Sequence, residues 1–223
     1  MSFRCLLLLG ALLAMIPHAW AQADKIPNGV FLIAKPAMAD PNFRRSVVLV
    51  TQAPEGTTVG FIINRPSNRS LAQILPDSEV FKRFTEPLYV GGPVQREDLF
   101  AVFRTKEKPQ GAPGVLSVLD DLAFAMDPAA VEKLMHAPPE RVRFFNGYAG
   151  WAPGQLAAEL ERGGWYMLNA DADIVFRKNM DTLWEELIGR LRSVTAMLQG
   201  GASAHARLRV HRQTTRPRLA TGA

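Results

Sequence analysis

Few side chains in this sequence could carry acid–base or metal chemistry. The chain has four histidines and one cysteine, and two of the histidines lie in an arginine-rich C-terminal stretch. His136 follows a predicted helix, where an imidazolium would complement the helix dipole. The acids Asp120-Asp121 and Asp171/Asp173 lie in predicted turns, where Asp is common for local hydrogen bonding. We therefore predict no Ser-His-Asp triad, no metal and no cofactor, and a carboxylate-dependent hydrolase is one alternative.

Asn64-Arg65-Pro66 is the first candidate binding motif, because it ends an apolar segment typical of a buried strand. A guanidinium is a planar fork that binds carboxylates or phosphates in pairs, so Arg65 could clamp an anion. The alternative is structural. In it, Asn64 forms a turn and Arg65 pairs with Asp40 or with another acid of the domain.

Gly91-Gly92-Pro93 and the aromatic pair Tyr148 and Trp151 are further candidates. The two glycines either present backbone N–H groups to an anion or form a tight turn that needs a positive φ. The aromatic pair either walls a ligand pocket or packs a loop against the sheet. If the domain has a pocket, we expect these loops and the Asn64-Arg65 turn to line it.

These candidates lie between short apolar segments that are typical of strands. The first three are continuous rather than alternating, which predicts strands covered on both faces. The predicted strands are Val30–Ala34, Ser46–Thr51, Val59–Ile63, Leu88–Val90, Leu99–Phe103, Val115–Leu119, Val142–Phe145, Trp165–Leu168 and Ile174–Phe176.

Helices are predicted between and after these strands. Asp127 is a suitable N-cap before Pro128, and Gly163 ends a helix from Pro153 to Arg162. Apolar residues at helical spacing predict a last helix over Asp181–Gln199, and Leu71–Leu75 and Ser78–Phe84 are predicted as helical turns. Strands and helices do not alternate regularly, so the predicted class is α+β rather than a doubly wound parallel sheet.

The N-terminus has the pattern of a cleavable secretory signal. One positive charge at Arg4 precedes an apolar run from Cys5 to Ile16, and Ala19-Trp20-Ala21 follows. The run has 12 residues, whereas a membrane-spanning helix needs about 20. We predict a signal peptide over residues 1–21, cleavage near Ala21, and export to the periplasm or the medium. The only cysteine would leave with the signal.

The formal net charge of +5 comes from the ends of the chain. Setting aside Arg4 and the five arginines after Gly200 leaves 20 of the 26 basic residues, against 21 acids. We therefore predict one near-neutral domain over residues 22–199 and a disordered Arg-rich tail over 200–223. The tail either contacts anionic lipid or polymer or only aids solubility.

Three ordered segments carry a family resemblance. They are Gly29-x-Phe31-Leu32-Ile33-Ala34-x-Pro36-x-Met38-x-Asp40-Pro41-x-Phe43-x-Arg45-Ser46-Val47; Gly60-x-Ile62-Ile63-Asn64-Arg65-Pro66 with Tyr89-Val90-Gly91-Gly92-Pro93-Val94; and Gly147-Tyr148-Ala149-Gly150-Trp151-x-Pro153-Gly154-Gln155-Leu156-x-x-Glu159-Leu160. In this order they resemble the bacterial YqgE/AlgH family. The resemblance implies a single α+β domain, with a bifurcated mixed sheet curled into a partial barrel, surrounding helices and a C-terminal helix. It implies no established activity, only an association with transcriptional regulation.

The chain departs from that family at two positions. Thr51-Gln52 stands where members commonly have Glu-His, and Phe103-Arg104 where they often have Leu-His. The first functional hypothesis is an exported, non-enzymatic domain that binds a small anion or an envelope protein. The alternative is a transcriptional regulator, but DNA binding needs a basic face and export would remove the DNA.

Overall fold

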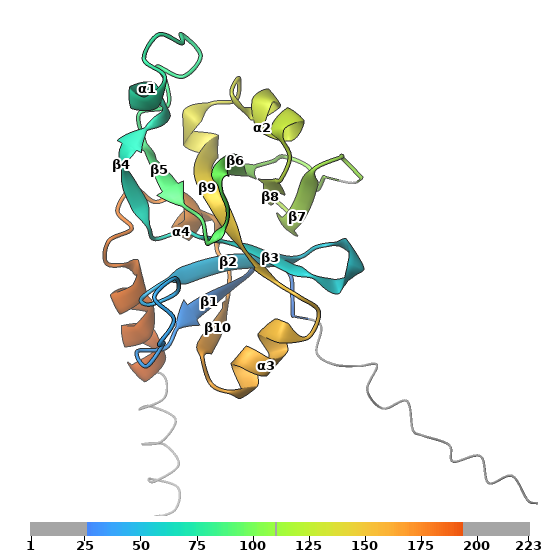
Figure 1. Ribbon diagram of the computed structural model, residues 1–223, viewed down its shortest axis with the longest axis vertical. Coiled ribbons are helices and arrows are strands. Elements are labelled where there is room, and N and C mark those ends of the chain that lie inside the picture. The colour runs from blue at the N-terminus through green and yellow to red at the C-terminus, as the bar shows by residue number, and fades with distance from the viewer. Residues whose placement is uncertain (1–25, 110, 194–223) are drawn as a thin grey trace, which may run out of the picture.

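A computed structural model describes residues 26–109 and 111–193 (Figure 1). The strands are β1 (Val30–Ala34), β2 (Val47–Gln52), β3 (Thr58–Ile62), β4 (Pro66–Ser70), β5 (Pro87–Val90), β6 (Val94–Arg104), β7 (Val115–Leu119), β8 (Leu122–Ala125), β9 (Val142–Trp151) and β10 (Trp165–Asn169). The helices are α1 (Leu71–Ile74), α2 (Pro128–Leu134), α3 (Gln155–Glu161), α4 (Ala172–Phe176) and a C-terminal helix over 183–193, with 3-10 turns at Pro54–Gly56 and Pro139–Arg141.

The sheet has the order β10-β1-β2-β3-β9-β6-β8-β7, and β4 and β5 branch from it. The branch arises at the long strand β9. Its C-terminal half pairs with β3, and its N-terminal half pairs with β6 and, in parallel, with β5. Thr51 on β2 donates its hydroxyl to the carbonyl of Ser117 on β7 at 2.7 Å, which ties the end strand β7 to β2 across the curl. The predicted bifurcated, curled α+β sheet is confirmed.

The continuous apolar strands are buried on both faces, as their sequences predict. Val47 and Leu49 lie in the largest core cluster, whereas Val48 and Val50 point to the opposite side, toward α3. Successive side chains of a strand alternate between its faces, so an all-apolar strand needs a core on each side.

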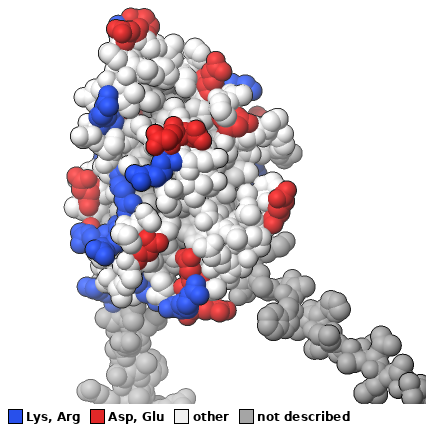
Figure 2. Space-filling model, in the orientation of Figure 1, with Lys and Arg blue, Asp and Glu red and all other residues white. Residues whose placement is uncertain are grey.

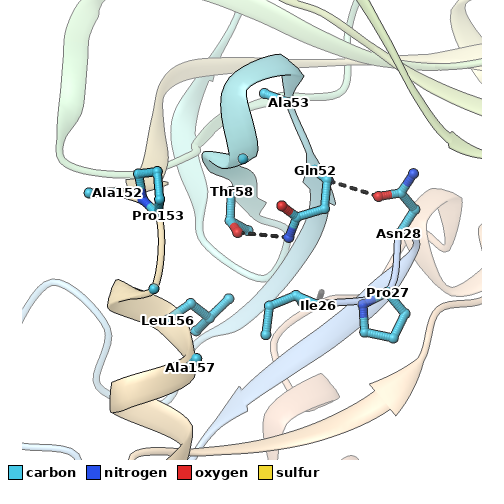
Figure 3. Close-up of a pocket in the computed structure, with 12 residues that line it drawn as sticks. Ile26, Pro27, Asn28, Gln52, Ala53, Thr58, Ala152, Pro153, Leu156 and Ala157 are labelled. Carbon is cyan, nitrogen blue, oxygen red and sulfur yellow. Dashed lines mark hydrogen bonds between the residues drawn. The ribbon is translucent and has the colours of Figure 1, made fainter. Parts of the chain in front are cut away.

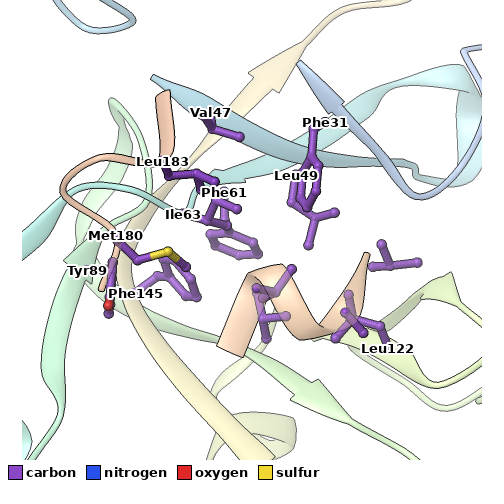
Figure 4. Close-up of a cluster of buried hydrophobic side chains, with 14 of the residues drawn as sticks. Phe31, Val47, Leu49, Phe61, Ile63, Tyr89, Leu122, Phe145, Met180 and Leu183 are labelled. Carbon is purple, nitrogen blue, oxygen red and sulfur yellow. The ribbon is translucent and has the colours of Figure 1, made fainter. Parts of the chain in front are cut away.

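The C-terminal helix closes the largest core. Leu183, Trp184 and Leu187 are buried in that cluster with residues of β1, β2, β3 and β9 (Figure 4). The Trp184 indole N–H donates to the Ala34 carbonyl at 2.7 Å, which fixes the helix against β1. The apolar stripe predicted for this helix is therefore the face that packs against the core, over the described residues 183–193.

The sequence pattern was wrong for one short segment. Ile174–Phe176 is part of α4 and not a strand, because Asp171 caps this segment by accepting the N–H of Asp173 at 2.8 Å. Ser78–Phe84 forms hydrogen-bonded turns, as predicted: the Ser78 carbonyl accepts the N–H groups of Phe81 and Lys82, at 3.0 and 3.2 Å. The predicted loop from Gly147 onward is the C-terminal half of β9, and strands β4 and β8 were not predicted.

The predicted signal peptide and the predicted Arg-rich tail lie outside the described residues, so both stay predictions. Within residues 26–109 and 111–193, no helix has the length and apolar character needed to cross a membrane.

A half-buried ion pair fastens α4 to the C-terminal helix and gives a pH prediction. Arg177 donates to both carboxylate oxygens of Glu186, at 2.8 and 3.0 Å, and Thr182 donates a third bond. The Arg177 hydrogen bonds, and then the Thr182 bond, lower the pKa of Glu186 to about 2. Because this pKa is lower when folded, the contribution to stability is full above the unfolded pKa of about 4.3 and is lost toward pH 2.

We therefore expect Glu186→Gln to make the acid unfolding curve less steep between about pH 4 and pH 2. Circular dichroism at stepped pH measures this. Glu140→Gln, on the turn before β9, is the control and should leave the slope unchanged. Parallel slopes for Glu186→Gln and wild type would contradict the assignment.

Candidate functional site

An open cleft of about 700 Å³ lies between three segments of the described part. They are the approach to β1, the β2–β3 hairpin and the start of α3, and Figure 3 shows them facing one another around the cleft. The lining residues are Ile26, Pro27, Asn28, Gln52, Ala53, Gly56, Thr58, Ala152, Pro153, Gly154, Leu156 and Ala157. We call this the hairpin cleft.

All twelve lining residues are uncharged at neutral pH. None carries a titratable carboxyl, imidazole, amine or thiol group, so none can transfer a proton as a general acid or base at neutral pH. Most of the wall is aliphatic, and the polar side chains are Asn28, Gln52 and Thr58. A mostly apolar wall with a few placed polar groups is typical of a binding site.

The polar groups of the cleft are ordered by bonds to one another (Figure 3). Asn28 accepts the backbone N–H of Gln52 at 2.9 Å, and the Gln52 side-chain amide donates to the Thr58 hydroxyl at 2.9 Å. These bonds use the Asn28 oxygen and the Gln52 nitrogen. The Asn28 Nδ2 donor and the Gln52 Oε1 acceptor have no bond from other described residues. An amide donor and an amide acceptor are therefore held on one side of the cleft.

The wall beneath α3 is held by a buried tryptophan pair. The indole N–H groups of Trp151 and Trp165 both donate to one oxygen of Glu159, at 3.1 and 3.0 Å. Gln155 donates to the other oxygen at 3.1 Å. Glu159 thus links α3 to β9 and β10 and fixes the helix that presents Leu156 and Ala157 to the cleft.

Glu159→Ala removes the acceptor of two indole N–H groups. Because a buried donor without a partner costs about 1–3 kcal/mol, we expect a loss of roughly 2–3 kcal/mol of unfolding free energy. Urea unfolding followed by tryptophan fluorescence measures this. Glu161→Ala, on the exposed side of the same helix, is the control and should change stability by less than about 0.5 kcal/mol. Equal losses in the two variants would contradict the role of Glu159.

The Asn64-Arg65 motif fastens the loop between β1 and β2. Asn64 accepts the N–H of Val47 at 2.8 Å and donates to the Arg45 carbonyl at 2.9 Å. Arg65 donates to the carbonyls of Asn42 and Arg44, at 2.8 and 3.5 Å, and burial lowers its pKa. Within the described part, Arg65 makes no ion pair with Asp40. Its role is still structural, but the partners differ from the prediction, because the guanidinium donates to backbone carbonyls.

Asp40 also serves its own loop, because it accepts the N–H of Asn42 at 2.8 Å.

The positive-φ interpretation of Gly91 and Gly92 was wrong, since neither residue has a positive φ. The physical reason for glycine is close backbone approach. A Cβ on Gly91 would lie 2.2 Å from the Gly147 carbonyl oxygen, and one on Gly92 would lie 2.2 Å from the carbonyl carbon of Tyr148. The Gly91 N–H donates to the Asn146 carbonyl at 2.8 Å, so it is already engaged.

Tyr148 and Trp151 both lie on β9 and pack within the domain. The Tyr148 ring meets Phe100 edge-on at 5.4 Å between ring centroids. Trp151 is 3% exposed and stacks on Phe43 at 5.8 Å. Trp151 pairs with Thr58 in the sheet, but unlike Thr58 it is not among the residues that line the cleft.

The structure brings some of the predicted site residues together. The Arg65 carbonyl accepts the N–H of Val90 at 2.9 Å, next to Gly91, and Gly92 lies against Tyr148. Trp151 lies at the far end of β9. None of the predicted residues lines the hairpin cleft. Two sequence signals pointed toward the cleft. Gln52, of the departure at Thr51-Gln52, lies in its wall, and so do Pro153, Gly154 and Leu156 of the third segment that carries the family resemblance.

Arg104, at the second departure from the family pattern, forms ion pairs with acids of both predicted turns. Arg104 pairs with Asp121 at 3.0 Å and with Asp173, so one acid from each sequence pair meets the same guanidinium. Both carboxylates are thereby paired, as expected for a structural ion network. In the described ranges, no three His, Cys, Asp or Glu side chains are grouped so that they could hold a metal ion.

Charge on the visible face is mixed. Figure 2 shows Lys and Arg mainly on the β4 side, with Asp and Glu between them, and a largely uncharged opposite side. This face carries no uninterrupted basic stretch of the kind that follows a nucleic-acid backbone.

The curled, branched sheet with a neutral cleft defines a small α+β domain, and comparison with known proteins gives its family. A family model described as AlgH-like matches residues 31–196, and the chain belongs to this family. It is 33% identical over 176 residues to a UPF0301 protein of Mycobacterium tuberculosis, covering 78% of this chain and 86% of that protein. A UPF0301 protein of Mycobacterium avium is 34% identical over 174 residues, with 75% and 84% covered.

Two solved structures share the fold. The solution structure of the AlgH protein from Pseudomonas aeruginosa has a TM-score of 0.56 and 28% identity, over 88% of this chain and 98% of that one. The crystal structure of a Corynebacterium diphtheriae protein has a TM-score of 0.58 and 26% identity, over 75% and 88%.

Proposed function

We propose that this AlgH-like protein is an exported, non-enzymatic binding domain of the cell envelope. Its proposed ligand is an uncharged chain that carries amide groups, such as an extended polypeptide segment, bound in the hairpin cleft. The observation that carries this proposal is the cleft itself: about 700 Å³ lined by twelve uncharged residues. A cleft of this size lies within the usual range for ligand sites.

The polar pair in the cleft supports an amide ligand. A peptide group offers one N–H donor and one C=O acceptor, and the Gln52 oxygen and the Asn28 nitrogen are the complementary acceptor and donor. The aliphatic wall would pack against side chains of the ligand. A phosphate or carboxylate would find no cation in the lining to neutralise it, so a small anion fits this cleft less well than a neutral chain.

The cleft also supports binding rather than catalysis. Acid–base catalysis needs a titratable group within about 3 Å of the reacting atoms, or one water away. The carboxylate of Glu159, on the helix that borders the cleft, already accepts three N–H bonds, so it serves the fold.

Export is supported by the charged, apolar and small-residue order of the first 21 residues. Cell fractionation with N-terminal sequencing of the native protein tests it. We expect an exported protein whose chain starts near Gln22. A cytoplasmic protein starting at Met1 would overturn this part and favour the regulator.

Binding is tested with fluorescent capped hexapeptide libraries: one of uncharged residues and matched ones with two Asp or two Lys. We expect the uncharged library to bind best. Ala157→Phe places a ring in the cleft and should weaken that binding at least about tenfold, or by 1.4 kcal/mol. Glu161→Phe, on the exposed side of α3, should bind like wild type. Equal binding by both variants, or a preference for the Asp library, would contradict the cleft assignment.

A further inference from the structure

The chain enters the described domain through the wall of the hairpin cleft. Ile26, the first described residue, lines the cleft, is 8% exposed and belongs to the same apolar cluster as Leu156 of α3. Figure 3 shows the side chains of Ile26 and Leu156 facing each other in the cleft. Two residues further on, the Asn28 side chain accepts the Gln52 N–H at 2.9 Å, which holds this entry segment against β2. The sequence before Ile26 is therefore tethered at the cleft itself.

The sequence that precedes Ile26 matches the cleft in chemistry. From Cys5 to Ala23 it contains no Asp, Glu, Lys or Arg, and the run Cys5–Ile16 is apolar throughout. The cleft wall is likewise uncharged and mostly aliphatic. Removing apolar surface from water is favourable by about 25 cal/mol per Å². An apolar run tethered beside an apolar cleft therefore gains free energy by entering it.

The tether is long enough for the run to turn back into the cleft. Nine residues, 17–25, separate Ile16 from Ile26, and nine extended residues can span about 30 Å. A short tether also raises the effective concentration of the run at the cleft to the millimolar range. The run would thus compete with a free ligand of similar chemistry that is far more dilute.

We propose that the apolar run Cys5–Ile16 occupies the hairpin cleft in the uncleaved chain and blocks it, and that cleavage near Ala21 opens the cleft. This inference rests on the proposed function, because it takes the cleft as the site for an uncharged chain. Cleavage leaves four residues before Ile26, two of them charged, in place of the run. Ligand binding is thereby confined to the processed protein.

Binding by two forms of the chain tests this block. Cell-free synthesis without membranes gives the uncleaved chain of residues 1–223, and a second preparation starts at Gln22. The probe is the uncharged capped hexapeptide library. A run that binds with a Kd of about 0.1 mM, at an effective concentration of about 1 mM, lowers the apparent affinity for the probe about tenfold. We therefore expect the uncleaved chain to bind about tenfold more weakly than the chain that starts at Gln22.

Two substitutions in the uncleaved chain separate the run from its mere presence. Leu8→Asp places a charge within the run, which makes entry into an apolar cleft unfavourable, so this variant should regain most of the lost affinity. Ser2→Asp places the same charge before the run and is the matched control. It should bind as weakly as the unmodified uncleaved chain.

The single cysteine of the sequence locates the run directly. Cys5 is the first residue of the run, so a nitroxide attached to its thiol broadens the amide signals of residues near the run. In the uncleaved chain we expect broadening at Thr58, Leu156 and Ala157, and Leu8→Asp should remove it. Circular dichroism and sedimentation velocity confirm that each protein is folded and monomeric.

Equal affinity of the two forms for the library would overturn this inference and leave the proposed function standing. Broadening that is absent from the cleft, or centred on another apolar surface such as Tyr166 and Met167 of β10, would overturn it too. If the chain that starts at Gln22 binds no peptide of the library, the proposed function fails. The broadening pattern alone then decides whether the run occupies the cleft.

Discussion

Gly91→Ala is expected to destabilise the domain by about 3 kcal/mol or more, because the new methyl group has no room. It would lie 2.2 Å from the Gly147 carbonyl oxygen and 2.8 Å from the Phe61 ring. The first contact is with backbone of β9, which cannot move without shifting its pairing with β5 and β6. Urea unfolding followed by circular dichroism measures the change in midpoint and free energy.

Gly189→Ala is the matched control, since a Cβ there meets nothing within 4 Å. Gly189 lies inside the C-terminal helix, where alanine is favoured over glycine by about 0.8–1 kcal/mol, so this variant should gain stability. The two substitutions add the same methyl group with opposite expected signs. A Gly91→Ala protein as stable as wild type would show that β5 and β9 do not cross as closely as described.

Arg143→Ala is expected to cost about 3 kcal/mol, because Arg143 is a buried cation that holds α4 against the sheet. It is 5% exposed and donates to the carbonyls of Val175, at 2.5 Å, and Arg177, at 3.1 Å. Its guanidinium also lies 4.5 Å from the centre of the Tyr89 ring. Burial lowers the pKa of Arg143 and raises that of Tyr89.

Arg143→Lys tests whether the positive charge or the planar guanidinium group of Arg143 is needed. A lysine keeps a cation but cannot reach two carbonyls with fixed planar donors, so we expect a loss smaller than that of alanine but clearly measurable. Thermal unfolding of wild type and the two variants, at one pH and salt concentration, gives their order of stability. If alanine were tolerated as well as lysine, the carbonyl contacts would not be what positions α4.

The sequence predicted the strands whose neighbours cover both faces, because such strands are apolar throughout. Val47–Val50 is an example, with alternate side chains in two clusters. It failed for α4, because a three-residue apolar segment fits strand and helix equally and the contacts that fix it come from Arg143, about thirty residues away. It failed for the end of β9 because the glycines around Tyr148 suggested a loop, whereas they make room for the crossing at Gly92.

The candidate site was harder to predict than the fold. Motifs such as Asn64-Arg65 and Gly91-Gly92 attract attention because their residue types are functional elsewhere, yet here their polar groups bond to the backbone. The hairpin cleft is formed by ordinary residues from three segments far apart in the chain. Only the topology of β1, β2, β3 and α3 brings Asn28, Gln52 and Leu156 together.

The most direct test of the central claim is an amide chemical-shift titration of the labelled protein with the uncharged capped hexapeptide library. If the hairpin cleft is the binding site, the largest shifts will come from the backbone amides of Gln52, Thr58, Leu156 and Ala157, and those of Arg65 and Gly91 will stay in place. Shifts centred on Arg65, Gly91 and Tyr148, with none in the cleft, would contradict the claim. They would place the binding site at the motifs that the sequence analysis selected.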